Sequence, residues 1–255
     1  MPDGLLGRWL QHPLTRDLAL DDPRTTSRRR LIIEQKPFLG RVYAEWYARI
    51  LGELGGRAAV LEIGSGAGFF AQLLPSAISS ERFWIPGVAV VANAERLPFA
   101  RGALDAIVMT DVLHHLPDPA AFFREAGRCV RPGGRTVMIE PWRTGWSEFV
   151  YGRFHHEPFQ PRAGWRIPPS GPLSGANGAL PWILFERDRA LFERTFPEWR
   201  VARIETMMPL AYLASGGVSL RYSLPPWCYG AVRWLERHLF ERAWSMFALI
   251  ALDRI

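Results

Sequence analysis

The stretch VLEIGSGAGFF, residues 60–70, decides how this chain is interpreted. Apolar residues lead into Glu62, and glycines follow at positions 64, 66 and 68. A short apolar run that ends in glycine is typical of a buried parallel strand followed by a tight loop. Glycine lets a ligand approach the backbone closely, so the loop predicts a binding site. The stretch alone leaves phosphate, a dinucleotide and other cofactors open.

Strands and helices alternate around this stretch. Short apolar strands are expected at 58–63, 77–79, 88–93, 104–111 and 135–141, and helices at 37–54, 69–75 and 119–130. Such alternation predicts a mostly parallel sheet with helices on both faces. The segment between Glu81 and Asn93 is too short for a full helix.

The flanking parts have a different character. Residues 1–30 are expected to be irregular, with turn material in DDPRTT. Residues 143–181 are rich in glycine, proline and aromatic residues and too long for a plain connection, which favours a lid. Two late strands are expected near 199–209 and 245–252, with an amphipathic helix between them. We divide a single domain into an N-terminal helical cap (1–57), a core (58–141), a lid (142–200) and late elements (201–255).

Composition narrows the classes of partner and location. The net charge is +6 and Lys36 is the only lysine, but the arginines are scattered and form no basic stripe with aromatics. We therefore expect no nucleic-acid partner. The two cysteines show no metal-ligand or disulfide spacing, and no apolar run suggests a signal peptide or a spanning helix. A cytoplasmic location is expected, although the helix containing Trp234 could touch a membrane surface. The oligomeric state is not determined by the sequence.

The glycine spacing separates the candidate ligands. A phosphate-binding P-loop needs a Gly-Lys-Ser/Thr ending, which is missing here. A dinucleotide fold favours G-x-G-x-x-G, whereas this loop reads G-x-G-x-G. Both common nucleotide loops therefore fit less well than a third class of cofactor.

Four segments carry a resemblance to a known family. They are VLEIGSGAGFF, NAERLPF, LDAIVMTDVLHHLPDP and RCVRPGGRTVMIEP, in this order within residues 58–141. The chain resembles the class I S-adenosylmethionine-dependent methyltransferases, particularly the type 11 group. The resemblance implies a Rossmann-like α/β fold, a mostly parallel sheet with an antiparallel edge pair, to which this chain adds its aromatic-rich lid. It also implies S-adenosyl-L-methionine as cofactor and S-adenosyl-L-homocysteine as product.

The resemblance also assigns the cofactor site. Glu62 is expected to attract the ammonium of the cofactor and Glu81 to take the ribose hydroxyls, while Phe83 could lie against the adenine. Asn93 stands where the family usually has an aspartate for the adenine amino group, and its amide oxygen can accept the same bond. The full predicted set is Glu62, Gly64, Ser65, Gly66, Gly68, Glu81, Asn93, Ala94 and Asp111.

Histidines supply the candidate catalytic groups. An alcohol, phenol or acid acceptor needs a base, and histidine is the usual choice. His114 and His115 lie in LHHLPDP, and His155 and His156 precede Glu157 in FHHEPF. Structural roles for all four remain open.

A metal site is an alternative interpretation of the same residues. The D-x-x-H-H spacing of Asp111, His114 and His115 is similar to the E-x-x-E-H set of certain quinone and small-RNA methyltransferases. Together with a lid histidine, these residues could bind Mg, Mn or Zn. The match is loose, so we assign no metal ligand at this stage.

The function predicted from the sequence is methyl transfer from S-adenosylmethionine to a small-molecule acceptor. Oxygen is the preferred acceptor atom because of the histidines. N- or C-methylation of a small molecule or lipid, RNA methylation, and a non-catalytic cofactor-binding subunit are the alternatives.

Overall fold

One mixed sheet organises the molecule. The computed structural model describes residues 10–16, 18, 21–66, 68–155, 157–168, 175–239 and 241–255. Within these residues seven strands pair in the order β3-β2-β1-β4-β5-β7-β6. They are β1 Val60–Ile63, β2 Ile78–Glu81, β3 Val90–Val91, β4 Leu104–Thr110, β5 Val130–Pro141, β6 Trp199–Met207 and β7 Phe247–Arg254. β3 to β5 run parallel, whereas β7 is antiparallel to β5 and β6. The predicted Rossmann-like fold with its antiparallel edge pair is confirmed.

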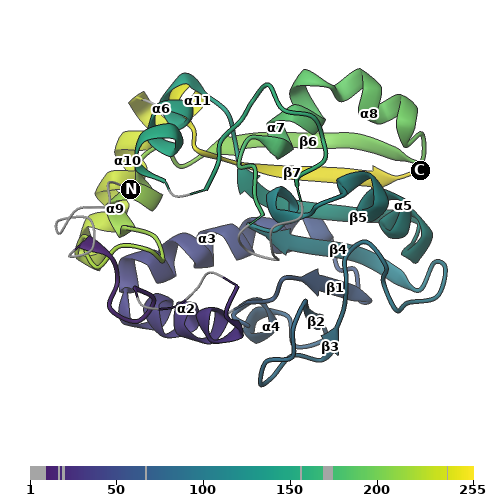
Figure 1. The fold of residues 1–255 in the computed structure, drawn as a ribbon, viewed down its shortest axis with the longest axis horizontal. Helices are drawn as coiled ribbons and strands as arrows, with labels where there is room; N and C mark the ends of the chain where they lie inside the picture. Colours follow the sequence, from purple (N-terminus) through teal and green to yellow (C-terminus); the bar gives the residue numbers. More distant parts are fainter. Residues whose placement is uncertain are drawn as a thin grey trace.

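Helices flank the sheet on both faces (Figure 1). They are α2 Pro23–Gln35, α3 Pro37–Leu54, α4 Phe70–Leu73, α5 Pro119–Cys129, α6 Gly145–Phe154, α7 Leu180–Trp182, α8 Arg189–Thr195, α9 Ala211–Ser215, α10 Tyr229–Leu239 and α11 Glu241–Trp244. Short 3-10 turns, η1 Leu113–His115 and η3 Pro226–Cys228, and a π-helical segment, η2 Ile183–Arg187, complete the order. No helix among the described residues is both long and apolar enough to span a membrane.

Two hydrophobic cores lie on opposite faces of the sheet. Successive side chains of a strand point to opposite faces. In β4, Ile107 and Met109 join the core that also contains α5 and α8, whereas Ala106 and Val108 join the core under α3. All four are buried, so β4 reads as a continuous apolar run, as a central parallel strand should.

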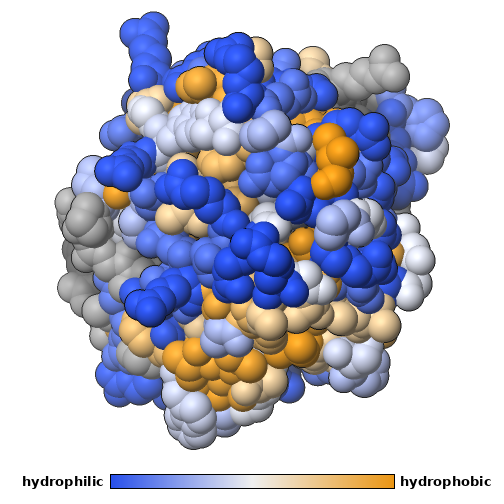
Figure 2. Space-filling view, turned by 90° about the vertical axis from the view of Figure 1, so that its right-hand side faces the viewer, coloured by the Kyte–Doolittle hydropathy of each residue, from blue (hydrophilic) through white to orange (hydrophobic). Residues whose placement is uncertain are grey.

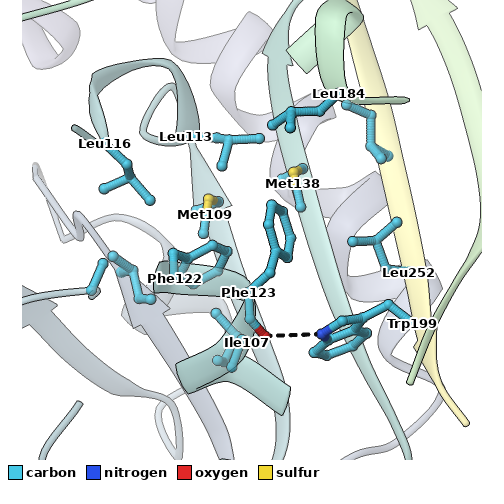
Figure 3. Packing of buried hydrophobic residues seen from close by; sticks show 14 of the residues in the cluster. Ile107, Met109, Leu113, Leu116, Phe122, Phe123, Met138, Leu184, Trp199 and Leu252 are labelled. Carbon is cyan, nitrogen blue, oxygen red and sulfur yellow. Dashed lines mark hydrogen bonds between the residues drawn. The ribbon is translucent and has the colours of Figure 1, made fainter. Parts of the chain in front are cut away.

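The first core is tied to the sheet edge by one hydrogen bond. Trp199 of β6 is 1% exposed, and its indole nitrogen donates to the carbonyl oxygen of Phe123 in α5 at 3.1 Å (Figure 3). The ring of Phe123 packs edge-on against Phe185 and Phe192. α5 is thereby fixed on the face opposite α3.

The N-terminal prediction needs a correction. Residues 1–30 are not irregular throughout, because α2 begins at Pro23. Asp22 caps this helix by accepting a hydrogen bond from the Arg24 amide at 2.9 Å, and proline stands at the first helical position. The pair DP in DDPRTT is therefore a helix start rather than a turn. The consequence is functional, since α2 brings Arg29 to the cavity described below.

The segment predicted as a lid contains a helix. Thr144 caps α6 in a reciprocal pair with Ser147, and the helix ends at Phe154. The following chain returns to η1, because the Asn177 amide donates to the His114 carbonyl at 2.9 Å. The side-chain oxygen of Asn177 also accepts from the Gln160 amide at 2.9 Å. These bonds fix the segment beside the carboxyl end of β4.

The two ends of the sheet differ in what they present. The parallel strands point toward the left-hand side of Figure 1, where α2 and α9 lie. Figure 2 shows the opposite side, around the C-terminus, which hydrophilic residues mostly cover and on which apolar residues gather in the lower part. Ligands of open α/β sheets bind outside the carboxyl ends of the strands. The site is therefore expected at the left-hand side of Figure 1.

Candidate active site

A cavity of about 420 Å³ opens at the carboxyl ends of β1, β2 and β4. The strand order reverses between β1 and β4, which is the switch point where such folds bind ligands. The loop after β1 forms one wall, and α2 and α3 contribute Arg29, Tyr43 and Tyr47 to another. η1, residues 157–159 and Tyr212 of α9 line the remainder.

Glu62 gives the cavity a buried acid. Its side chain lies at the end of β1 and is 4% exposed. Burial raises the pKa of Glu62 to about 8, Ser65 opposes this shift by a hydrogen bond, and the charge of Glu81 adds to it. Among the described residues, Oε2 of Glu62 has no hydrogen-bond partner. A buried carboxylate oxygen of this kind is suited to a cationic ligand group.

The glycine loop is pinned to β2. The Gly66 amide donates to Glu81 Oε1 at 2.6 Å, and the Ser80 amide donates to Ser65 Oγ at 2.9 Å. Burial raises the pKa of Glu81, although hydrogen bonds from the Gly66 and Arg82 amides oppose this. Glu81 therefore stands at the end of the second strand, as predicted, and faces the same cavity as Glu62.

The far end of the cavity contains the residues predicted for the adenine. Phe83, Asn93 and Ala94 all line it, and residues 82–89 form bends and turns rather than a helix. The Asn93 side-chain oxygen accepts from the Glu95 amide at 3.0 Å, so one of its lone pairs is used within a turn. Gly68 is not among the lining residues.

The carboxyl end of β4 carries a strained acid. Asp111 has a backbone φ of 58°, which is uncommon outside glycine and recurs at functional sites. Burial raises the pKa of Asp111 to about 7; the charge of His114 lowers it, and Glu140 and Glu157 raise it. Asp111 lines the cavity, as predicted.

Glu140, at the end of β5, positions the turn that follows Asp111. Its Oε1 accepts from the Val112 and Leu113 amides at 2.9 and 2.7 Å. Its Oε2 lies 2.7 Å from His114 Nδ1. Glu140 is 0% exposed and thus fixes both the start of η1 and the ring of His114.

Glu157 brings the histidines of two segments together. One of its oxygens lies 3.5 Å from His114 Nε2 and the other 3.8 Å from His115 Nε2. His155 Nδ1 lies 3.7 Å from the same carboxylate. The other ring nitrogen of His115, Nδ1, lies 3.1 Å from the Gly175 carbonyl oxygen.

Burial and charge set the protonation of this cluster. Burial lowers the pKa of His114, but its contacts with Glu140 and Glu157 outweigh this and hold the pKa well above the usual range. Burial and the charge of His114 lower the pKa of His115 to about 3. Burial raises the pKa of Glu157, but the three histidines outweigh it and bring the pKa far below its usual range. In the absence of further ligands, these shifts favour a protonated His114 between Glu140 and Glu157 and a neutral His115.

The structure places most, but not all, of the predicted site residues at the cavity. His114, His115 and His155 meet there, whereas His156 lies outside the described residues. The lid tryptophans contribute no wall. They pack elsewhere, with Trp142 in the core, Trp146 against Trp244, Trp165 donating to Asp188 and Trp182 under Arg143.

Glu140, which contacts His114, and two tyrosines that line the cavity, Tyr151 and Tyr212, were not predicted from the sequence. A signal existed for Glu140. The apolar run TVMI leads into this acid, as the apolar run before Glu62 leads into that one. No comparable pattern marks the tyrosines, which come from α6 and α9.

The fold and the cavity define a Rossmann-like domain with acids at the carboxyl ends of β1 and β2 that face one cavity. Residues 61–138 match a protein family described as a methyltransferase domain, type 11. This part of the chain is therefore a class I, S-adenosylmethionine-dependent methyltransferase domain.

Similar proteins agree with this class. An uncharacterized methyltransferase of Mycobacterium sp. (strain JLS) is 32% identical over 113 residues, 36% of this chain and 42% of that protein. A demethylmenaquinone methyltransferase of Mycolicibacterium vanbaalenii is 45% identical over 51 residues, 20% of this chain and 22% of that protein. The chain thus spans less than half the length of these curated relatives.

A solved structure extends the likeness in fold to nearly the whole chain. The geranyl diphosphate C-methyltransferase of Streptomyces coelicolor A3(2), in complex with Mg²⁺, geranyl diphosphate and S-adenosyl-L-homocysteine, superposes with a TM-score of 0.53. The match covers 96% of this chain and 92% of that chain at 17% identity. At this identity the likeness concerns the fold alone.

The residues present fit S-adenosylmethionine. Its ammonium group matches the unpartnered Oε2 of Glu62, and a Cβ at Gly64 would close the turn against Val112. Glu81 offers a carboxylate to ribose hydroxyls at the end of β2. The cofactor supplies a methyl group bonded to a sulfonium.

Cofactor affinity is expected to depend on pH through Glu62. With a free-state pKa of about 8, this acid is mostly protonated at pH 6, and an ammonium beside it favours the ionised form. Binding therefore releases a proton, and the affinity for S-adenosylhomocysteine should rise by up to about tenfold per pH unit between pH 5.5 and 7. Calorimetry across this range measures it. A Glu62→Gln variant should bind more weakly and without this slope, and an equal slope in both proteins would contradict the assignment.

Proposed function

We propose that this protein transfers the methyl group of S-adenosylmethionine to an oxygen of a small, flat or apolar acceptor. The observation that carries the proposal is that one cavity reaches from Glu62 and Glu81 to the cluster of His114, His115 and Glu157. Methyl transfer mainly requires that donor and acceptor share an enclosed space in the right orientation. The cavity provides such a space next to groups that can handle a proton.

Aromatic rings support the acceptor class. Tyr151 stacks on Phe159 at a centroid distance of 5.0 Å, and Tyr212 lies edge-on to Phe247 at 4.9 Å. All four line the cavity near the histidines. Ligand sites walled by aromatic side chains with a few polar groups favour apolar small molecules. A relative named for demethylmenaquinone is consistent with such an acceptor.

The polar cluster supports oxygen as the acceptor atom. A hydroxyl must lose its proton as its oxygen attacks the methyl group, so a proton acceptor is needed beside it. Asp111, whose pKa burial raises to about 7, faces the cavity together with His115 and Glu157, and Glu140 holds His114 in place beside them. An aromatic cavity without such groups would suffice for an acceptor that has no proton to lose.

The test is an assay of the purified protein with S-adenosylmethionine and matched phenols, hydroxy acids, amines and carbon nucleophiles. We expect S-adenosylhomocysteine and an O-methylated product, identified by mass spectrometry. Products methylated only at nitrogen or carbon would overturn the oxygen assignment. RNA methylation with salt-dependent RNA binding would replace the small-molecule proposal. Cofactor binding without turnover on any acceptor would favour a non-catalytic subunit.

Glu157→Gln should lower kcat/KM by about 100-fold or more, the range for disruption of acid–base machinery, because it removes the carboxylate that His114 and His115 share. Affinity for S-adenosylhomocysteine should stay within about threefold. The variant changes the histidine cluster and leaves Glu62 and Glu81 of the cavity intact. The matched control is Glu148→Gln, since Glu148 is 44% exposed and pairs with Arg143 on the surface. A Glu157→Gln enzyme as active as the Glu148→Gln enzyme would refute the role of the cluster.

A further inference from the structure

We propose that His114, His115 and Glu157 form a binding site for one divalent transition-metal ion. The inference deepens the proposed function, on which its catalytic role rests, because the ion would hold the acceptor oxygen. Metal binding itself follows from the geometry of the three side chains and can be tested without an acceptor.

The potential ligand atoms already converge. Each of the three residues offers one atom, and these atoms all lie within 4.8 Å of one another. The Nε2 atoms of His114 and His115 lie 3.5 and 3.8 Å from the two oxygens of Glu157. Around an ion with bonds of about 2.1 Å, neighbouring ligand atoms are about 3 to 3.5 Å apart. The separations of 3.5 and 3.8 Å are therefore close to those around a bound ion.

Both imidazole rings are oriented from behind. His114 Nδ1 lies 2.7 Å from Glu140 Oε2, and His115 Nδ1 lies 3.1 Å from the Gly175 carbonyl oxygen. Metal-binding histidines typically donate their second ring N–H to a carboxylate or a backbone carbonyl, which fixes the tautomer and leaves the other nitrogen to the metal. Here His114 has a carboxylate partner and His115 a backbone carbonyl partner. The Nε2 atoms of both rings lie near the carboxylate of Glu157.

The supporting shell is itself held rigidly. The second oxygen of Glu140 is occupied by the Val112 and Leu113 amides, so this acid orients His114. The Asn177 amide donates to the His114 carbonyl, and the Asn177 side-chain oxygen accepts from the Gln160 amide. The segment that carries Glu157 is thereby tied to the turn that carries the histidines. Three sequence-distant parts of the chain are assembled for one cluster.

The donor set indicates the class of ion. Two imidazole nitrogens and one carboxylate suit Zn²⁺, Fe²⁺, Co²⁺ or Mn²⁺, whereas Mg²⁺ and Ca²⁺ prefer oxygen ligands throughout. Two further acids, Glu140 and Asp111, each place a carboxylate oxygen within 4.8 Å of a ring nitrogen of His114. A divalent cation would add positive charge beside these acids.

All three residues face the cavity, so the remaining coordination positions would be open to it. A metal-bound hydroxyl loses its proton more readily than a free one. The acceptor O–H would release its proton to water, and the oxygen would form the new O–CH₃ bond as the S–CH₃ bond breaks, with that electron pair remaining on sulfur. The ion would thus promote deprotonation of the acceptor without a general base.

The test uses the full chain without an affinity tag, stripped with a chelator and titrated with Co²⁺ and with Zn²⁺. We expect one equivalent of each to bind, with a Co²⁺ absorption spectrum typical of nitrogen and oxygen ligands. His115→Gln and Glu157→Gln should each weaken Zn²⁺ binding by about 100-fold or more. The matched control is His238→Gln, because His238 lies on α10 and its Nδ1 lies 2.8 Å from the Trp234 carbonyl oxygen of the same helix. Circular dichroism would confirm that each variant is folded.

The outcomes separate this inference from the proposed function. Absence of stoichiometric binding to the folded wild-type protein, or equal binding by the two site variants and the control, would overturn the metal site. One-to-one binding lost in the site variants would establish it even if no acceptor is methylated, in which case only the proposed function fails. O-methylation at full rate in the stripped protein would refute the metal site's catalytic role while leaving the proposed function intact.

Discussion

The Gly64→Ala variant is expected to lose about 100-fold in affinity for S-adenosylhomocysteine, equivalent to about 2.7 kcal/mol. Gly64 has a φ of +67°, and a methyl group there would lie 2.4 Å from Val112 Cγ2. The left-handed backbone alone costs about 1–2 kcal/mol for an alanine. Val112 cannot yield freely, because Glu140 holds its amide. The turn beside Glu62 must therefore deform. Calorimetric titration of the folded variant measures the loss.

Alanine variants of two further glycines distinguish the effect of a strained backbone from the effect of a steric clash. Gly87 has a φ of +89° but nothing within 4 Å of an added Cβ, so Gly87→Ala should cost stability and leave cofactor affinity unchanged. Gly66 has a φ of +48° and its nearest neighbour at 3.6 Å, so Gly66→Ala should be intermediate in affinity. If Gly64→Ala bound the ligand as well as Gly87→Ala does, the placement of the ligand beside Gly64 would be wrong.

Replacing Arg233 with methionine should lower the free energy of unfolding by about 3–5 kcal/mol. Arg233 is 2% exposed and bridges Glu45 of α3, with its Nη2 at 2.8 Å, and Glu236 of its own helix. Glu236 is 0% exposed and accepts from the Leu210 and Ala211 amides at the start of α9. Loss of the guanidinium leaves the buried Glu236 without the cation paired with it, whereas Glu45 keeps Arg49 at 2.9 Å. Denaturant unfolding measures the change.

Arg237→Met is the matched control. Arg237 lies one turn further along α10, is 54% exposed and sits 3.7 Å from the same Glu45. Exposed pairs of this kind contribute about 0–1 kcal/mol. Similar losses in the two variants would show that burial of Arg233 contributes nothing beyond a surface charge pair. The network also explains how α10 is attached. Arg233 pairs inward with Glu45 of α3, and Glu236 accepts from the amides at the start of α9, while Trp234 is 60% exposed.

Local patterns predicted the central fold because the signals lie within single elements. The apolar runs that became β1, β4 and β5 are short, end in glycine or an acid, and are buried on both faces. Their positions also put Glu62 and Glu81 at neighbouring strand ends. The start of α2 was missed because Asp22 and Pro23 serve equally in turns and at helix N-termini, and only the packing of the helix decides between them.

The sequence by itself determined a methyltransferase domain and predicted the residues assigned to its cofactor. Those features need only residues within one strand-loop unit and its neighbour, so spacing along the chain carries them. The tertiary structure alone decided what meets the acceptor. Glu140 comes from β5, the histidine pair from η1, and Glu157 from the segment after α6. Their contacts join residues 26 to 60 positions apart through hydrogen bonds that no local periodicity encodes. Pairing and burial of these groups, rather than their order, give the cluster its charges and its capacity to bind.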